Sequence, residues 1–195
     1  YRFVREYSAP RASFASYLYT ILKVLYSTLE IKKDDILESI IELKKINKKI
    51  NSSNLTNENP ALKLAESIIG TPIIYFPFGL QSAAIRFKNS LQENSKIHAM
   101  IENIVETCHN GIVAWEKKSD MQPILIQGKN DFRKTEERWI IIKDYFEKNE
   151  ITYNEIVSIN GNILSKLINL IYILDYTSIY LAVKTKIDPC PVKSI

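Results

Sequence analysis

The feature that most constrains the fold is the alternation, after residue 60, of short apolar runs with longer amphipathic segments. The apolar runs predict strands at residues 72–76, 124–126 and 152–159. The longer segments repeat apolar residues at helical spacing and predict helices at residues 61–69, 80–92 and 134–148. Strands that alternate with helices are typical of a parallel sheet covered on both faces. We therefore expect an α/β fold, a three-layer sandwich around a mainly parallel sheet.

The chain before this region is expected to be helical. Residues 14–29 are dense in Leu, Tyr and Ile, follow Ser13 as a possible helix cap, and predict a buried helix. Residues 34–50 repeat apolar side chains at helical spacing, with acidic residues first and lysines last, which suits the helix dipole. Residues 51–60 are polar and rich in helix breakers. We therefore divide the chain into a helical connecting segment with its linker, 1–57, and an α/β domain, 58–195.

The last predicted helix, residues 163–183, is long and strongly apolar. Its length alone would allow a membrane span. Lys166 and Asp175 interrupt it, however, and each charge within a lone span would cost about 2.5–3.5 kcal/mol on insertion scales. We predict a helix buried within the fold or at a subunit interface, and no membrane partner.

Composition narrows the function classes. The 195 residues contain 26 Lys and Arg against 22 Asp and Glu, a net charge of +4, and the two signs are interleaved. Nucleic-acid binding therefore receives no support, and we interpret the lysines at the end of segment 34–50 as a solvated helix face. The two cysteines form no CxxC pair or zinc pattern, which favours a reducing, cytoplasmic setting.

Taken residue by residue, the catalytic inventory is small. The sequence contains no glycine-rich phosphate loop, nucleophile elbow, metal-binding histidine pair or paired-carboxylate motif. Its two histidines are His98 and His109, and Cys108 adjoins the second. Sequence neighbours usually point to different faces, so a Cys108–His109 thiolate pair is disfavoured. The alternatives are a histidine hydrogen-bonded within the fold and, for Glu93 in the polar segment 86–96, an ordinary surface carboxylate.

Four separated motifs change this assessment when they are taken together. They are S-A-P-R-A-S-F at 8–14, K-N-S-L-Q-E-N-S-K at 88–96, C-H-N-G-I-V-A-W at 108–115, and L-D-Y-T-S-I-Y-L-A with D-P-C-P-V-K between 174 and 193. In this order and spacing they resemble the second half of the archaeal-type bifunctional phosphoglucose/phosphomannose isomerases. That family has two sugar isomerase (SIS) domains, each an α/β sandwich, and acts as a dimer on sugar 6-phosphates without a metal or other cofactor.

The resemblance implies roles for individual residues. Glu93 would be the base that moves a proton between C1 and C2, and Arg11 would stabilise the negative charge of the intermediate. His109 would open the sugar ring from across the interface of a homodimer with a shared active site. Lys193 would assist ring opening and contact substrate hydroxyls. Lys96 and Asn110 would bind substrate.

The chemistry requires such a set of groups. Aldose and ketose interconvert through a cis-enediol, so one carboxylate must remove a proton from one carbon and return it to the next. Enediolate charge requires a fixed cation, and arginine stays protonated at any relevant pH. Sugar phosphates are mostly cyclic, so a titratable group such as histidine must first open the ring.

The leading hypothesis is therefore the C-terminal SIS domain, with its connecting helices, of a glucose/mannose 6-phosphate isomerase. The phosphate-binding loop of that family belongs to the N-terminal SIS domain, which we expect to be absent from this chain. On this hypothesis the chain alone binds sugar phosphate weakly and turns over little. The alternatives are a non-catalytic sugar-phosphate-binding or dimerisation module, in which Gly111, Cys108 and Phe76–Phe78 mark lost catalysis, and a helical scaffold built on residues 163–183.

Overall fold

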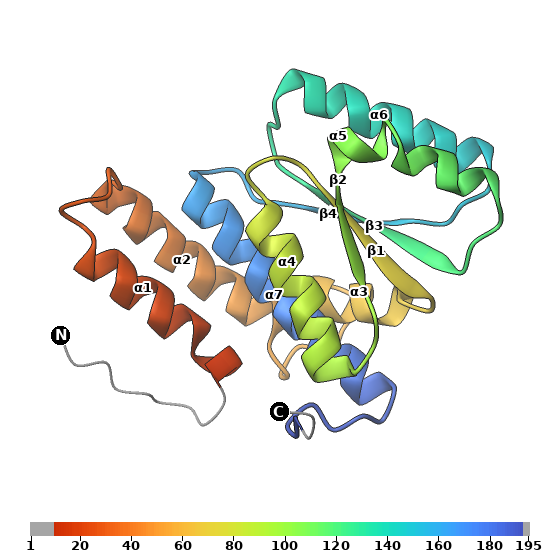
Figure 1. The fold of residues 1–195 in the computed structure, drawn as a ribbon. Coiled ribbons are helices and arrows are strands. Elements are labelled where there is room, and N and C mark those ends of the chain that lie inside the picture. The colour runs from red at the N-terminus through yellow and green to blue at the C-terminus, as the bar shows by residue number, and fades with distance from the viewer. Residues whose placement is uncertain (1–9, 193–195) are drawn as a thin grey trace.

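A computed structural model describes residues 10–192, which form a parallel sheet between two layers of helices (Figure 1). The sheet has four strands in the order β2-β1-β3-β4. The strands are β1 (Thr71–Phe76), β2 (Met100–Asn103), β3 (Met121–Gln127) and β4 (Asn154–Val157). All neighbouring strands pair in parallel, so the predicted α/β three-layer sandwich is confirmed.

Helices cover both faces of the sheet because successive strand residues point to opposite sides. Ile74 and Phe76 join the larger core, whereas Tyr75 between them joins a second, smaller core. Helices α2, α3, α4 and α7 cover the larger core, and α5 and α6 cover the smaller one (Figure 1). The helices are α1 (Phe14–Val24), α2 (Lys33–Ile50), α3 (Pro60–Ser67), α4 (Gln81–Ser90), α5 (Ile104–Thr107), α6 (Arg133–Lys148) and α7 (Ile163–Lys184). Short helical turns are η1 (Pro10–Ser13), η2 (Leu91–Ser95) and η3 (Gly111–Glu116).

Local sequence explains where several helices begin. The Asn59 side chain accepts hydrogen bonds from the backbone N–H groups of Ala61 and Leu62, both at 3.0 Å, and Pro60 occupies the first helical position of α3. Asn162 caps α7 in the same way by accepting from the Ser165 N–H at 2.9 Å. These caps satisfy donors that have no partner within the helix.

Helix α7 is the centre of the helical layer. It packs against α2, α3 and α4, and its buried apolar residues include Ile168, Leu170, Leu174 and Leu181. By length and hydropathy it is also the one helix of the described chain that is able to cross a membrane, yet 56% of its most apolar stretch is buried inside the domain. The prediction of a buried helix is therefore confirmed, and α7 is a core helix of this fold.

Two sequence-based expectations were wrong, and one strand was not predicted. Helix α1 ends at Val24, and only Leu22 of its apolar residues is buried, whereas Ile21 is 53% exposed. Ser13 precedes α1 without making a side-chain cap, and its buried hydroxyl has no hydrogen-bond partner in the structure. Strand β2 was not predicted because its sequence, Met-Ile-Glu-Asn, lies at an edge of the sheet and lacks an apolar run.

Candidate functional site

The carboxylate of Glu93 is carried by a distorted helical turn. Residues Leu91–Ser95 continue α4 as a π-helical turn, which ends at Lys96 in the left-handed conformation with φ 57°. The backbone N–H of Lys96 donates to the carbonyl of Leu91, which closes the wide turn. Single π-helical turns within α-helices are frequently found at functional sites.

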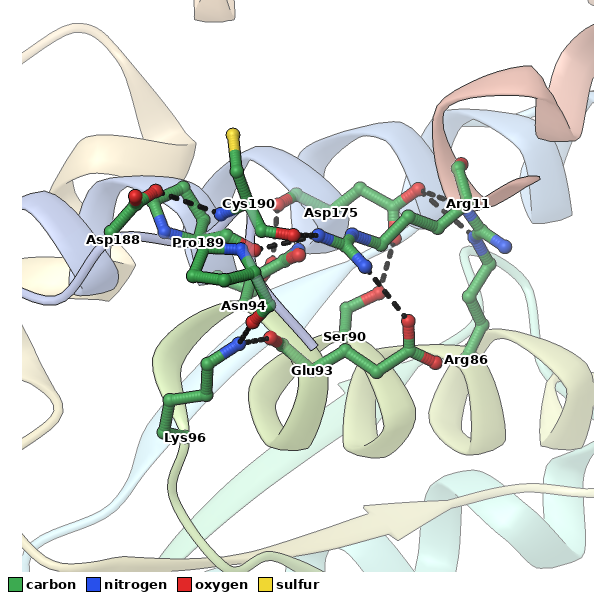
Figure 2. Close-up of polar contacts among 12 residues, drawn as sticks. Arg11, Arg86, Ser90, Glu93, Asn94, Lys96, Asp175, Asp188, Pro189 and Cys190 are labelled. Atoms are coloured by element: carbon green, nitrogen blue, oxygen red, sulfur yellow. Dashed lines mark hydrogen bonds and ion pairs between the residues drawn. The ribbon is translucent and has the colours of Figure 1, made fainter. Parts of the chain in front are cut away.

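Arg11 lies beside Glu93, although the two residues are 82 positions apart in sequence. The Arg11 Nη1 atom lies 3.4 Å from Glu93 Oε2, with the Arg11 side chain 21% exposed and the Glu93 side chain 46% exposed. The Arg11 Nη2 atom donates to two backbone carbonyls, those of Pro189 at 2.6 Å and Cys190 at 3.0 Å (Figure 2). The guanidinium is thus fixed on one side and faces an accessible carboxylate on the other.

Lys96 links the π-helical turn to the same C-terminal segment. Its Nζ atom donates to the carbonyl of Pro191 at 2.8 Å and also to the backbone carbonyl of Glu93 (Figure 2). Two cations, Arg11 and Lys96, therefore hold the segment that follows α7. Lys193, which the resemblance assigns to the site, lies outside the described residues.

A hollow of about 330 Å³ opens beside the Arg11–Glu93 pair. Its polar lining comes from Arg11 and from one face of α4 and its π-helical turn, namely Ser82, Arg86, Asn89, Ser90 and Glu93. A concave surface on which a small number of polar groups converge is typical of small-molecule sites.

Three residues to which the sequence assigned no role in the site support this cluster. Arg86 donates to Asp175 Oδ2 from Nε at 2.9 Å and from Nη2 at 2.7 Å, and Ser90 donates to Asp175 Oδ1 at 2.7 Å. Burial raises the pKa of the Asp175 carboxyl above its ordinary value, although Arg86 and Ser90 act in the opposite direction. The available signal was Asp175 itself, a charge within an otherwise apolar helix.

His109 and Asn110 are not part of the Arg11–Glu93 cluster within one chain. Glu93 precedes β2, whereas both residues are exposed after α5, beyond the opposite end of that strand (Figure 1). Cys108 points elsewhere again, because its Sγ atom donates to the Arg138 carbonyl on α6 at 3.8 Å. Burial raises the pKa of the Cys108 thiol, which keeps it protonated, so the disfavoured Cys108–His109 pair gains no support.

The structure shows the surroundings of two positions that the non-catalytic alternative treats as marks of lost catalysis, Gly111 and Phe76–Phe78. A Cβ atom on Gly111 would clash with the Glu102 Oε2 atom, so the Glu102 carboxylate would have to move to admit a side chain at 111. Phe76 is buried in the larger core, whereas Phe78 is 95% exposed in the turn after β1. Neither position contacts the Arg11–Glu93 pair.

The location of the cluster is unusual for a parallel sheet. Ligands of open α/β sheets usually bind at the carboxyl ends of the strands. Glu93 instead lies at the end of α4 that is distant from the carboxyl end of β1, just before β2 begins. An accessible site here is compatible with completion by another domain or subunit. Within residues 10–192, no three His, Cys, Asp or Glu side chains are grouped to hold a metal ion.

Comparison with solved structures defines the class of fold. A glucose-6-phosphate isomerase like protein from Thermus thermophilus superposes with a TM-score of 0.73 at 15% identity, over 97% of this chain and 62% of that protein. A glucosamine-6-phosphate deaminase from Thermotoga maritima gives a TM-score of 0.65 at 11% identity, over 98% of this chain and 58% of that protein. At such low identity these likenesses establish the sugar isomerase fold.

Sequence comparison then establishes the family. A family model described as the bacterial phospho-glucose isomerase C-terminal SIS domain matches residues 57–195, and the chain belongs to this family. A bifunctional phosphoglucose/phosphomannose isomerase from Caldicellulosiruptor bescii is 34% identical over 129 residues, which cover 64% of this chain and 38% of that protein. The Aquifex aeolicus protein of the same description is 26% identical over 193 residues, covering 95% of this chain and 56% of that protein. The chain therefore spans about half or less of these relatives, and the resemblance seen in its motifs is confirmed.

Proposed function

We propose that this chain is the C-terminal part of an enzyme that interconverts glucose 6-phosphate or mannose 6-phosphate with fructose 6-phosphate. The observation that carries the proposal is the Arg11–Glu93 pair, a fixed guanidinium facing an accessible carboxylate. Membership of the isomerase family supports the substrate class. We further propose that residues 1–57 connect an N-terminal SIS domain to the one described above.

Glu93 is the proposed base. Its carboxylate takes the proton from C2 of the open-chain aldose, and the electron pair moves through C1 to the carbonyl oxygen, giving a cis-enediolate with negative charge on O1. The proton on the O2 hydroxyl is transferred to O1, and the same Glu93 carboxyl group then returns a proton to C1, so that O2 becomes the ketone oxygen and O1 a hydroxyl. Hydrogen moves from C2 to C1 without an external oxidant, so the proposed reaction needs no redox cofactor. We propose that the Arg11 cation stabilises the enediolate charge without a metal ion.

Arg11 is the proposed electrostatic partner. The enediolate carries negative charge on O1 and O2, and arginine provides a permanent cation for it. Because the Pro189 and Cys190 carbonyls already hold Nη2, the guanidinium does not have to reorganise when that charge develops. Lys96 is placed to contribute a second positive charge at the edge of the site.

His109 is proposed to act from a second subunit. Within one chain, Glu93 and His109 lie beyond opposite ends of β2. We propose that two copies of the protein face each other, so that His109 and Asn110 of each copy enter the site of the other. His109 would open the sugar ring, and Lys193 and Asn110 would contact substrate hydroxyls. We also propose a cytoplasmic location, since Cys108 and Cys190 are both free thiols.

The proposal is tested with the longest natural form of the protein. We expect it to convert glucose 6-phosphate and mannose 6-phosphate to fructose 6-phosphate, as followed by NMR, and to do so in the presence of a chelator. Residues 1–195 alone are expected to show little turnover. A long form without activity on either substrate would overturn the enzyme proposal and leave the non-catalytic binding module, in which Gly111 marks lost catalysis.

The shared site predicts complementation between two impaired variants. Glu93→Gln and His109→Asn would each be nearly inactive as homodimers. When the two are unfolded together and refolded, half of the dimers are mixed, and one of the two sites in each mixed dimer has both native residues. Activity should then return to about one quarter of the wild-type level. If each site used Glu93 and His109 of one chain, no mixed dimer would have an intact site and activity would stay absent.

A further inference from the structure

The ion pair between Arg86 and Asp175 connects two helices beneath the candidate site. Arg86 is on α4 and Asp175 is on α7, and their side chains are 20% and 21% exposed. Two nitrogen atoms of Arg86 donate to one carboxylate oxygen of Asp175, and Ser90 donates to the other oxygen. The carboxylate is thus held by three hydrogen bonds from the helix that leads to Glu93.

The same guanidinium also holds the segment that carries Arg11. The Arg86 Nη2 atom donates to the backbone carbonyl of Arg11 at 3.0 Å. Its Cζ atom lies 4.0 Å from the centre of the Phe14 ring, a cation–π contact at the start of α1. Arg86 therefore fixes both the backbone of Arg11 and the helix that follows it.

Three segments that are distant in sequence meet at this ion pair, and each contributes to the site (Figure 2). The first is η1, which carries Arg11, and the second is α4 with its π-helical turn, which carries Glu93 three residues after Ser90. The third is α7, whose continuation supplies the Pro189 and Cys190 carbonyls that bind Arg11. A second hollow of about 260 Å³ lies at this junction and is lined by Arg11, Phe14, Arg86, Ser90, Asn94 and Asp175.

Stability alone gives little reason for this arrangement. Removing two charges from water costs free energy that their attraction only partly offsets, and well-packed apolar residues often serve equally well. The raised pKa of Asp175, caused mainly by burial, reflects this cost. An apolar pair at these two positions would provide no donor for the Arg11 carbonyl and no cation for the Phe14 ring at the start of α1.

We propose that Arg86 and Asp175 are positioning residues for the isomerisation: they fix the Arg11 guanidinium opposite Glu93. This inference rests on the proposed function and goes further by naming residues that act through Arg11. Displacing a catalytic group by about 1 Å costs on the order of a hundredfold in rate. The loss should appear in kcat, because Arg11 acts on charge that develops only during the reaction.

The test uses three variants of the longest natural form. Asp175→Asn, which keeps the shape of the side chain and removes its charge, is expected to lower kcat about 10- to 100-fold with little change in KM. The double variant Arg86→Met/Asp175→Leu removes both buried charges, so we expect it to recover thermal stability while kcat remains low. Asp144→Asn is the matched control, since Asp144 forms an exposed ion pair with Lys148 on α6.

A binding measurement separates positioning from general structural damage. 5-Phosphoarabinonate carries a carboxylate where the enediolate charge forms, so it reports on Arg11 in the folded protein. The double variant should lose affinity for this analogue at least tenfold more than for glucose 6-phosphate. If the wild-type protein is active and both Asp175 variants keep its kcat and its affinity for the analogue, the positioning role alone is overturned. An inactive wild-type protein would overturn the proposed function and this inference with it.

Discussion

Replacing Glu93 by glutamine in the longest natural form is expected to lower kcat by about a thousandfold. Glutamine keeps the length of the side chain and its contact with Arg11 but is unable to accept a proton from carbon. Because the neutral amide still fits beside the guanidinium, KM should change little. Isomerisation measured in deuterium oxide gives a direct readout, since the variant should also stop incorporating solvent deuterium at C1 and C2.

Glu66 provides the control for this experiment. It is an exposed glutamate on α3, away from the π-helical turn. Glu66→Gln should retain wild-type kcat and thermal stability. If Glu93→Gln retained wild-type kcat as well, another group would be the base and Glu93 would be an ordinary surface carboxylate.

Replacing Arg11 by methionine is expected to lower kcat by about 10²- to 10³-fold, the usual effect of removing one electrostatic contact to a developing oxyanion. The loss has two sources, because the variant removes the cation and also frees the Pro189 and Cys190 carbonyls. Arg11→Lys should fall between the wild type and Arg11→Met, since lysine keeps the charge but lacks the planar fork that contacts several acceptors together. Steady-state kinetics on both sugar phosphates measure these effects.

Arg133→Met is the matched control for Arg11. Arg133 is 87% exposed at the start of α6 and pairs with Glu137 within the same helix. Its removal should leave kcat unchanged. An Arg11→Met variant that affected only KM would indicate that Arg11 binds substrate without stabilising the reaction's charge, and would contradict the proposed role.

The sequence predicted most of the strands and helices because buried elements repeat apolar residues with the period of their secondary structure. Strands β1 and β3 and helix α7 were found in this way, since their residues lie deep in the cores. Strand β2 was missed because an edge strand needs little apolar surface. The expectation for helix α1 was wrong for the opposite reason: apolar composition does not by itself bury a helix, and Ile21 and Val24 of α1 are exposed.

The candidate site was predictable only in part. The motifs marked Glu93, Arg11 and Lys96, and the structure places these three together. Periodicity gives no measure of which distant segments meet, so the role of the Arg86–Asp175 pair in joining η1, α4 and α7 could not be predicted from the sequence. His109 and Asn110 lie away from the cluster in one chain, and no pattern within a single sequence reports a contact between two subunits.

The central place of α7 has a consequence for how the protein is made. This helix is the last one in the described chain, yet α2, α3 and α4 all pack against it. During translation the earlier helices and strands emerge first, and their apolar faces toward α7 stay unpaired until residues 163–184 have left the ribosome. Nascent chains stopped before residue 163 should therefore bind holdase chaperones and be sensitive to protease. Once α7 has emerged, the apolar faces of α2, α3 and α4 can pack against it and complete the larger core.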